Sequence, residues 1–361
     1  MHGFRKAAAI TAAATMAFGL TGCEPPETWW PTVLEVPGIL ASAVVGDFDE
    51  DGLEDIYWYA PGSDPEEMWT ARPEGGFDRA PAPAVTGRYS AVAGDFDGDG
   101  DDDVLWVGVG GRVSALWTFE GGAVASKRTV ELGRVVSGDS TVVIERSSGP
   151  DHVGLVLGTS TTVEDRLAIW DPLRGATSSG PPLHGGRNPQ TYTGDFDGDG
   201  YGDVFLHRSG SATDSFGWGR ADGQYDSQTI TVYGRHLPAV LDADGDGRDD
   251  IAFFAERHTT ASSVPVWRGQ AGRWFAKASV GAPTVVGDTW VQEDRGDGRD
   301  NVIVRAERGD DQVWELGADG ATIVHTIIDF DGGVPLLGQF SAADRDDMYL
   351  WNDRLLLSPQ G

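Results

Sequence analysis

Aspartates at alternating positions of a short glycine-rich stretch form a candidate calcium site. Residues 94–104 read Gly-Asp-Phe-Asp-Gly-Asp-Gly-Asp-Asp-Asp-Val, so six carboxylates fall within nine residues. With Asp95 as position 1, carboxylates also stand at positions 3, 5 and 9, and Gly100 at position 6 permits a sharp turn. Position 12 is Trp106, inside an apolar run, where a helix-loop-helix calcium site carries a bidentate Glu. The loop is therefore predicted to connect two strands.

Three further complete copies of this loop begin at Asp47, Asp195 and Asp242, and all four share glycine at position 6. Each copy is predicted to offer four carboxylates and the backbone carbonyl of position 7 to one calcium ion. The predicted ligands are Asp47, Asp49, Asp51, Leu53 and Asp55; Asp95, Asp97, Asp99, Asp101 and Asp103; Asp195, Asp197, Asp199, Tyr201 and Asp203; and Asp242, Asp244, Asp246, Arg248 and Asp250. The alternative, an Asp-rich solvated turn, does not explain the spacing. We expect about four ions with a structural role, because the carboxylates of one loop would otherwise repel one another.

Three eroded copies extend the repeat along the chain, with first positions at Ile144, Glu293 and Gln339. The copies at 144 and 339 lack acids at positions 1, 3 and 5 and are predicted to be empty. In the 293 copy Arg295 replaces the aspartate of position 3, so binding there is not expected. Seven copies recur with a period of about 49 residues, which is typical of a repeat architecture.

Each repeat contains four short strand patterns, which predicts an all-β, seven-bladed propeller with four antiparallel strands in each blade. The last repeat ends before a fourth strand. Residues 29–36 have an unassigned strand pattern that can fill that place, so the N-terminal strand is predicted to close the ring and remove an exposed edge.

The loop residues 93–100 and their copies resemble the FG-GAP and VCBS-type repeats, which occur in the integrin alpha-subunit propeller and in bacterial surface proteins. The resemblance covers nearly all of residues 27–361. It implies a calcium-binding propeller of the integrin-alpha type. It leaves the ligand open, because such propellers serve adhesion, sugar binding and scaffolding.

Two further sets of residues repeat with the blades. One tryptophan per blade recurs on the third strand and is predicted to pack in the core, whereas Trp29, Trp30, Trp274 and Trp290 fall outside this set. A Gly-Arg pair precedes the first strand of four blades, at Arg88, Arg134, Arg187 and Arg235. These arginines are either an anion site at the mouth of the central channel, on the face opposite the Asp loops, or turn residues paired with nearby acids.

The N-terminus predicts export. Residues 1–22 have a basic start and a short apolar run that ends at Cys23, the sole cysteine, as in a bacterial lipoprotein signal. Lipidation of Cys23 would leave residues 23–26 as a tether and residues 27–361 as the propeller. The alternative is an ordinary secretory signal. A single cysteine permits no disulfide within the chain, so bound calcium is the cross-link expected to stabilise the fold.

The formal net charge of −30 argues against binding of nucleic acid and anionic lipid. No nucleophile elbow, phosphate loop or zinc-spaced histidine pair is present, so no catalytic residue is assigned. Arg-Gly-Asp at 295–297 and 308–310 is a weak adhesive signal. We expect a monomeric module, exported and anchored or secreted, that binds a surface protein or glycan. The alternatives are a calcium-dependent lectin with pockets between blades and a polysaccharide-degrading enzyme.

Overall fold

The computed structural model describes residues 32–35, 42–60, 65–135, 141–157, 166–180, 190–210, 213–255, 263–281, 289–292, 298–304, 311–317, 320–327, 334–342, 347–352 and 355–358. Every regular element in these ranges is a β-strand, and the 28 strands form seven four-stranded antiparallel sheets. No helix in the described part of the chain is long and apolar enough to cross a membrane. The signal segment, the tether and Cys23 lie outside the described residues.

We number the sheets as blades in chain order. Blade 1 contains β2 (Ser42–Gly46), β3 (Asp55–Tyr59), β4 (Glu67–Ala71) and β5 (Phe77–Pro81). Blade 2 contains β6 (Ser90–Gly94), β7 (Asp103–Val107), β8 (Ser114–Glu120) and β9 (Ala123–Val130). Blade 3 contains β10 (Val142–Ile144), β11 (His152–Leu157), β12 (Arg166–Asp171) and β13 (Ala176–Ser179). Blade 4 contains β14 (Gln190–Gly194), β15 (Asp203–His207), β16 (Asp214–Gly219) and β17 (Tyr225–Ile230).

The remaining three sheets follow the same order. Blade 5 contains β18 (His236–Leu241), β19 (Asp250–Ala255), β20 (Ser263–Gln270) and β21 (Trp274–Gly281). Blade 6 contains β22 (Thr289–Gln292), β23 (Asn301–Val304), β24 (Asp311–Gly317) and β25 (Gly320–Ile327). Blade 7 contains β26 (Val334–Gly338), β27 (Asp347–Asn352), β28 (Leu355–Ser358) and, from the other end of the chain, β1 (Thr32–Glu35).

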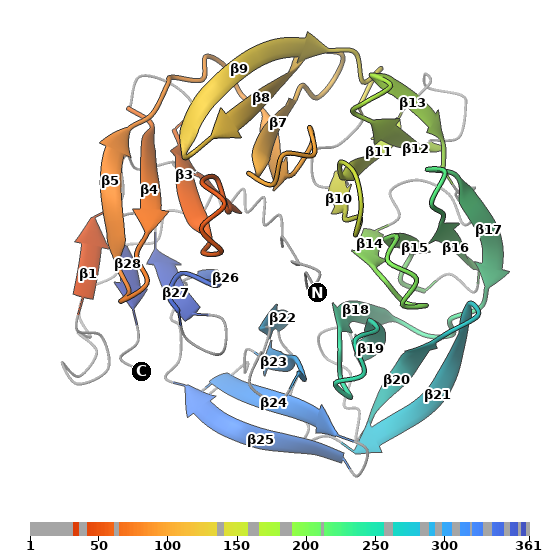
Figure 1. The fold of residues 1–361 in the computed structure, drawn as a ribbon. Helices are drawn as coiled ribbons and strands as arrows, with labels where there is room; N and C mark the ends of the chain where they lie inside the picture. Colours follow the sequence, from red (N-terminus) through yellow and green to blue (C-terminus); the bar gives the residue numbers. More distant parts are fainter. Residues whose placement is uncertain are drawn as a thin grey trace.

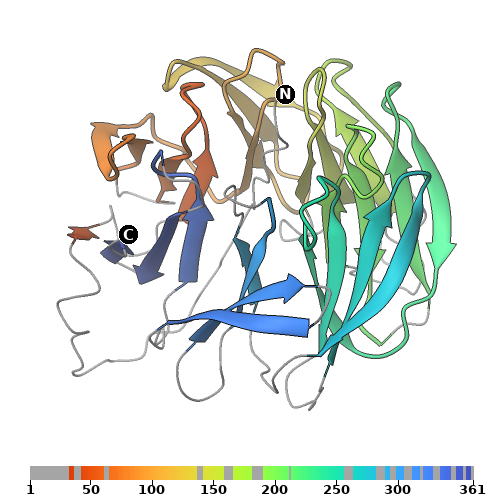
Figure 2. The same cartoon turned by 60° about the horizontal axis from the view of Figure 1, so that its bottom comes forward.

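The blades stand around a common axis, which makes the fold a β-propeller (Figure 1). The first strands of successive blades, from β2 to β26, lie next to one another and surround the axis. Because the strands run up and down along this axis, their ends gather on two faces (Figure 2). The Asp loops and the turns between third and fourth strands share one face, which we call the loop face. The turns between second and third strands and the connections between blades share the opposite face.

The two ends of the chain meet in blade 7. β1 pairs antiparallel with β28, in a register that places Thr32 opposite Ser358 and Glu35 opposite Leu355. Residues 32–35 of the pattern at 29–36 form this pairing, and the rest of that pattern lies outside the described residues.

Aromatic side chains fill the space within and between the blades. The third-strand tryptophans are buried, as predicted; they are Trp69, Trp117, Trp170, Trp218, Trp267 and Trp314. The phenylalanine at position 2 of the Asp loop contacts the next blade, with ring-centroid distances of 4.8 Å for Phe48–Phe119, 6.1 Å for Phe96–Trp170, 5.8 Å for Phe196–Phe275 and 5.6 Å for Phe340–Phe77. The Phe340–Phe77 contact joins the last blade to the first. Apolar packing thus continues from one blade to its neighbour.

Hydrogen bonds between neighbouring Asp loops also link the blades. In blades 1 to 6 the amide of loop position 8 donates to the carbonyl oxygen of position 1 in the preceding blade. The N–O pairs are Asp102–Asp47 (2.7 Å), Asp151–Asp95 (2.8 Å), Gly202–Glu145 (2.9 Å), Asp249–Asp195 (3.1 Å), Asp300–Asp242 (2.8 Å) and Glu54–Gln339 (2.7 Å). Where position 8 is Asp102, Asp249 or Asp300, its carboxylate accepts the amide of position 1 in return, at 2.7–3.0 Å. The position-8 acid therefore joins blades.

One eroded loop differs from the predicted frame. β10 ends at Ile144, so the loop of blade 3 begins at Glu145 and is one residue shorter than its copies. The amide of Gly202 fixes this register by donating to Glu145, where the other blades bond to position 1. The predicted first position at 144 was therefore wrong by one residue, because the end of a strand depends on pairing that the loop pattern does not contain.

Candidate calcium sites

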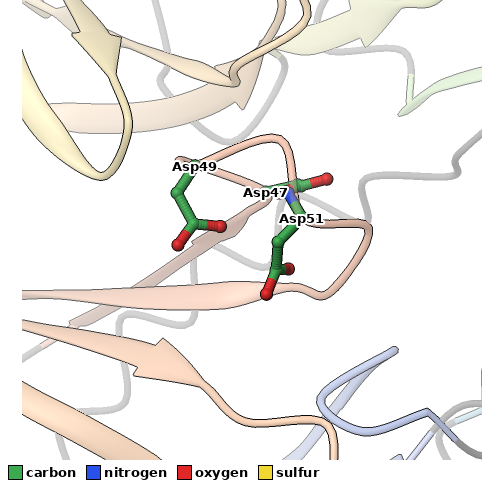
Figure 3. A group of neighbouring side chains, drawn as sticks. All are labelled: Asp47, Asp49 and Asp51. Atoms are coloured by element: carbon green, nitrogen blue, oxygen red, sulfur yellow. Dashed lines mark hydrogen bonds between the residues drawn. The ribbon is translucent and has the colours of Figure 1, made fainter.

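The structure brings together positions 1, 3 and 5 of each complete Asp loop. In all four loops, one carboxylate oxygen from each of these three residues lies within 4.8 Å of the other two; the groups are Asp47, Asp49 and Asp51; Asp95, Asp97 and Asp99; Asp195, Asp197 and Asp199; and Asp242, Asp244 and Asp246. Figure 3 shows the first group, in which all three side chains project from one turn of the loop. Carboxylate oxygens grouped in this way are the ligands that calcium prefers.

The aspartate at position 1 shapes the loop. Asp47 accepts the amides of Asp51 and Gly52 at 3.1 and 3.0 Å, and Asp195 accepts the equivalent amides of Asp199 and Gly200 at 3.1 and 2.9 Å. These bonds fold the following residues around the carboxylate. The amides that it accepts also stabilise its negative charge.

The aspartate at position 5 accepts the amide of position 7. The acceptor is Asp51 for Leu53, Asp99 for Asp101, Asp199 for Tyr201 and Asp246 for Arg248, at 2.8–3.3 Å. This bond holds position 7 close to the carboxylates. A role for its carbonyl oxygen in binding calcium stays a prediction.

Glycine is required at position 6 by the backbone. Gly100 has φ +108° and Gly52 has φ +92°, a left-handed region that strains other residues. Position 4 also has a positive φ, and glycine stands there in three complete loops, at Gly98, Gly198 and Gly245. The first loop departs from this rule, because Glu50 occupies position 4 with φ 56°.

The aspartate at position 9 lies in a different setting from the three clustered acids. It begins the second strand of the blade, is fully buried, and accepts the amide of a third-strand residue: Ala71 for Asp55, Phe119 for Asp103, Gly219 for Asp203 and Gly269 for Asp250, at 2.7–3.0 Å. In the loops that begin at Asp95 and Asp195, its second oxygen accepts the position-2 amide. Position 9 is therefore a cross-strand acceptor within the blade, a role that the sequence pattern did not reveal.

Several carboxylate oxygens in these loops are buried without a hydrogen-bond partner. They are one oxygen each of Asp49, Asp55, Asp101 and Asp244. Burial removes water from these atoms, and a buried anion without a partner is costly. A cation at the loops that begin at Asp47, Asp95 and Asp242 would supply the missing interaction, which is the structural argument that these residues fit calcium.

Burial also raises the pKa of the loop acids. Desolvation raises the pKa of Asp55, Asp103 and Asp250 to about 8, and that of Asp203 well above its usual value. The pKa of Asp97 rises to about 6 through desolvation and the nearby charge of Asp99. In the absence of a cation these carboxyl groups compete for protons.

We expect the calcium-free protein to lose stability as pH rises from 6 to 8.5. A carboxyl whose pKa is about 8 in the folded state and 3.8 in the unfolded state contributes its full stabilisation below pH 3.8. This stabilisation is lost progressively as the pH rises towards 8. Between pH 6 and 8.5, each such group lowers the free energy of unfolding by up to about 3 kcal/mol. Thermal melts of metal-stripped protein test the sign, with Asp103→Asn as a variant that should show a weaker pH dependence. A melting temperature that rises with pH in metal-stripped protein would contradict this account.

Arginines lie close to two of the loops, where they partly neutralise the acids. Arg273, in the turn before β21, donates from Nε to Asp197 at 3.3 Å, and Arg268 lies 3.3 Å from Asp244. Arg248, at position 7 of its loop, pairs with Asp246 through its side chain. These partners were not predicted, since Arg268 and Arg273 lie more than 20 residues from the loop residues that they contact.

The eroded loops have no acidic cluster among their described residues. In blade 3 the guanidinium of Arg146 lies over the ring of Tyr201 at 5.0 Å. Arg295 and both Arg-Gly-Asp segments lie outside the described residues.

Three of the four Gly-Arg pairs, those that end at Arg88, Arg134 and Arg235, lie on the connections between blades, on the face opposite the Asp loops. Arg88, Arg134 and Arg235 have exposed side chains, and Arg187 lies outside the described residues. The preceding glycines, Gly87, Gly133 and Gly234, have φ between +81° and +125°, so each pair marks a turn.

A histidine and an aspartate form a buried pair near the face opposite the Asp loops. His207 Nδ1 lies 3.3 Å from Asp214 Oδ1, with exposed fractions of 0% and 1%. The pair joins β15 to β16 and has no access to solvent.

Comparison with known proteins supports the repeat and the fold. Residues 47–106 match the family model of an FG-GAP-like repeat. No curated protein sequence matches the chain. Among solved structures, Kuenenia stuttgartiensis hydrazine synthase aligns with a TM-score of 0.52 and 10% identity, over 88% of this chain and 96% of that chain.

Two other solved structures resemble the chain more weakly. One is an Agrocybe aegerita lectin that recognises non-reducing terminal N-acetylglucosamine (TM-score 0.45, 12% identity, 86% of this chain and 74% of that chain). The other is the Dos1 propeller (TM-score 0.44, 9% identity, 88% of this chain and 78% of that chain). At these identities the likenesses concern the fold alone.

Proposed function

We propose that this protein is a calcium-stabilised propeller of seven blades that binds a macromolecular ligand outside the cell. Two observations support a role for calcium. Each of the four complete loops groups three aspartates, and several carboxylate oxygens in the loops are buried without a hydrogen-bond partner. Each ion would be held by the carboxylates of positions 1, 3 and 5. It would offset the repulsion among them and hold the loop face together.

The ring is proposed to close through blade 7. Three contacts between distant parts of the chain support this. They are the pairing of β1 with β28, the bond from the Glu54 amide to the Gln339 carbonyl, and the contact of Phe340 with Phe77. The pairing with β1 covers the edge of β28, which would otherwise be the outer edge of that sheet.

Ligand binding is proposed for the face opposite the Asp loops. Arg88, Arg134 and Arg235 are exposed there, and Tyr233, two residues before Arg235, is 79% exposed. Exposed arginine and tyrosine side chains are suited to a ligand with carboxylates or acidic sugars.

The experiment is a glycan array probed with calcium-loaded protein and with Arg88→Gln/Arg235→Gln. We expect the double variant to lose about tenfold or more in affinity for an acidic ligand, because two charged contacts are removed, while its melting temperature stays unchanged. Arg128→Gln is the matched control, because Arg128 is exposed on the outer strand β9.

The array also separates the alternatives. Binding of neutral glycans that the arginine variant retains would favour a lectin with pockets between blades. Turnover of a bound polysaccharide would identify an enzyme. Equal loss of stability in the arginine variant would mean that these residues are structural partners.

Export and anchoring through Cys23 belong to the same proposal and rest on the sequence pattern of residues 1–23. Mass spectrometry of the N-terminal peptide, from protein purified from cells, tests the anchor: an added acyl mass on Cys23 would support it. Its absence, with wild-type protein recovered in soluble form, would count against the anchor.

A further inference from the structure

We propose that Arg273 of blade 5 is a built-in counter-ion of the third complete loop, which begins at Asp195, and weakens calcium binding there. The inference rests on the proposed calcium role of the loops. It goes beyond that role, because the loop pattern alone predicts four equivalent sites. Arg273 lies 76 residues along the chain from the loop aspartate that it contacts, so the pattern does not contain it.

The side chain of Arg273 reaches from the turn between β20 and β21 back to blade 4. Its Nε donates to Asp197 Oδ2 at 3.3 Å, its Nη1 pairs with Asp226 on β17, and its Nη2 donates to the carbonyl of Gly219 at 3.4 Å. Asp197 is the position-3 acid of the third loop, and its side chain is only 6% exposed. Two contacts with blade 4 thus hold the guanidinium against one of the three clustered carboxylates.

Both carboxylate oxygens of Asp197 have a hydrogen-bond donor. Oδ1 accepts the amide of Asp199 at 3.2 Å, and Oδ2 accepts Nε of Arg273. Within the described ranges, the third loop has no buried carboxylate oxygen without a partner, whereas each of the other three complete loops has at least one. Arg273 therefore already supplies part of the interaction that a cation would supply in those loops.

The backbone at Arg273 points to a role for this side chain. Arg273 has φ 69°, in the left-handed region that strains residues other than glycine. The residue directly before the fourth strand is glycine in blades 1, 2 and 3, at Gly76, Gly122 and Gly175, with φ between 62° and 80°. An arginine kept at this place in spite of the strain favours a function for its guanidinium.

A fixed positive charge beside a ligand lowers the affinity of the site for a cation. Calcium would compete with the guanidinium for Asp197 Oδ2 and would be repelled by its charge. The second loop is the reference, since the described contacts of Asp95, Asp97 and Asp99 include no arginine or lysine. We expect the third loop to bind calcium roughly tenfold more weakly than the second.

The fourth loop is a less suitable reference, because it also has an arginine beside its position-3 acid. Nη1 of Arg268 lies 3.3 Å from Asp244 Oδ2. Asp244 Oδ1 is nevertheless buried without a partner, so this arginine leaves one oxygen of the acid for a cation. Both oxygens of the equivalent acid in the third loop have a donor, which is what distinguishes the contact of Arg273.

Calcium titration of the metal-stripped full chain tests the proposal, with affinities from calorimetry and ion counts from native mass spectrometry. In Arg273→Gln one ion should bind roughly tenfold more tightly than in the wild type. If the wild type holds only three ions, a fourth should appear. The gain should vanish when Asp199→Ala/Arg273→Gln is compared with Asp199→Ala, because the third loop has then lost a ligand.

Arg220→Gln is the matched control for the loss of one arginine. Arg220 also pairs with Asp226, at 3.1 Å, and in the described structure it contacts no aspartate of a complete loop. This variant should leave all calcium affinities unchanged.

The reverse change should produce the same effect in the first loop. Gly122 precedes the fourth strand of blade 2, and a Cβ placed on it would lie 3.5 Å from Cβ of Asp49, the position-3 acid of the first loop. Gly122→Arg should weaken one ion by roughly tenfold. Gly122→Ala has the same backbone strain without the charge and should leave the affinity unchanged. These two variants keep the proposal falsifiable if Arg273→Gln folds poorly.

Each contrary outcome has one meaning. Four ions with equal affinities in the wild type and in Arg273→Gln would overturn the counter-ion role and leave the calcium sites standing. A gain that persists in the Asp199→Ala background would show that Arg273 acts on another loop and would overturn its assignment to the third. A wild type that binds no calcium would instead defeat the proposed calcium role, and this inference with it.

Discussion

Removal of calcium is expected to lower the melting temperature of this protein by roughly 10 °C. Extracellular calcium modules have dissociation constants on the order of 0.1 to 1 mM. At ten times this concentration one site stabilises the folded state by about 1.4 kcal/mol, so four independent sites contribute about 5 to 6 kcal/mol. This is comparable with the stability of an ordinary domain. Thermal melts in calcium and in chelator measure the difference.

Single substitutions should change the number of bound ions one at a time. Asp97→Ala removes the position-3 ligand of the second loop and should cost one ion. Arg295→Asp restores the missing acid at position 3 of the 293 copy and should add one. Asp78→Ala, on the outer strand β5 and away from the loops, should leave the number unchanged. An unchanged melting curve in chelator would contradict a stabilising role for calcium in the Asp-rich loops, although the fold itself could stand.

Deletion of residues 24–37 is expected to destabilise the whole ring and not only one end of it. The deletion removes β1, the outer strand of blade 7, and exposes the edge of β28. Because each blade is stabilised by its neighbours, an opened blade 7 should weaken its packing on both sides. We expect a fall in melting temperature on the order of 10 °C and a tendency to self-associate through the exposed edge.

Deletion of residues 24–31 alone provides the control, because it keeps β1 and its pairing with β28. Thermal melts and size-exclusion chromatography measure both effects. If the longer deletion melts like the full chain and stays monomeric, β1 does not close the ring. The contacts of blade 7 with blade 1 through Gln339 and Phe340 would then suffice.

The sequence by itself determined the elements whose cause is local. Aspartates at positions 1, 3 and 5 with glycine at position 6 form a turn whose carboxylates face one another, whatever surrounds them, and all four clusters are found where the spacing predicted them. The period of about 49 residues likewise predicted where each four-stranded sheet lies along the chain. One tryptophan on each third strand was assigned to the core, and each of the six is buried.

Only the tertiary structure decided how residues of different loops and blades meet. Position 9 was predicted as a calcium ligand, and that role stays a prediction; its hydrogen bond to the third strand depends on the pairing of the sheet, as Asp103 with Phe119 shows. The position-8 acid acts on the preceding blade, so no spacing within its own loop reveals it; Asp102 and Asp47 are 55 residues apart.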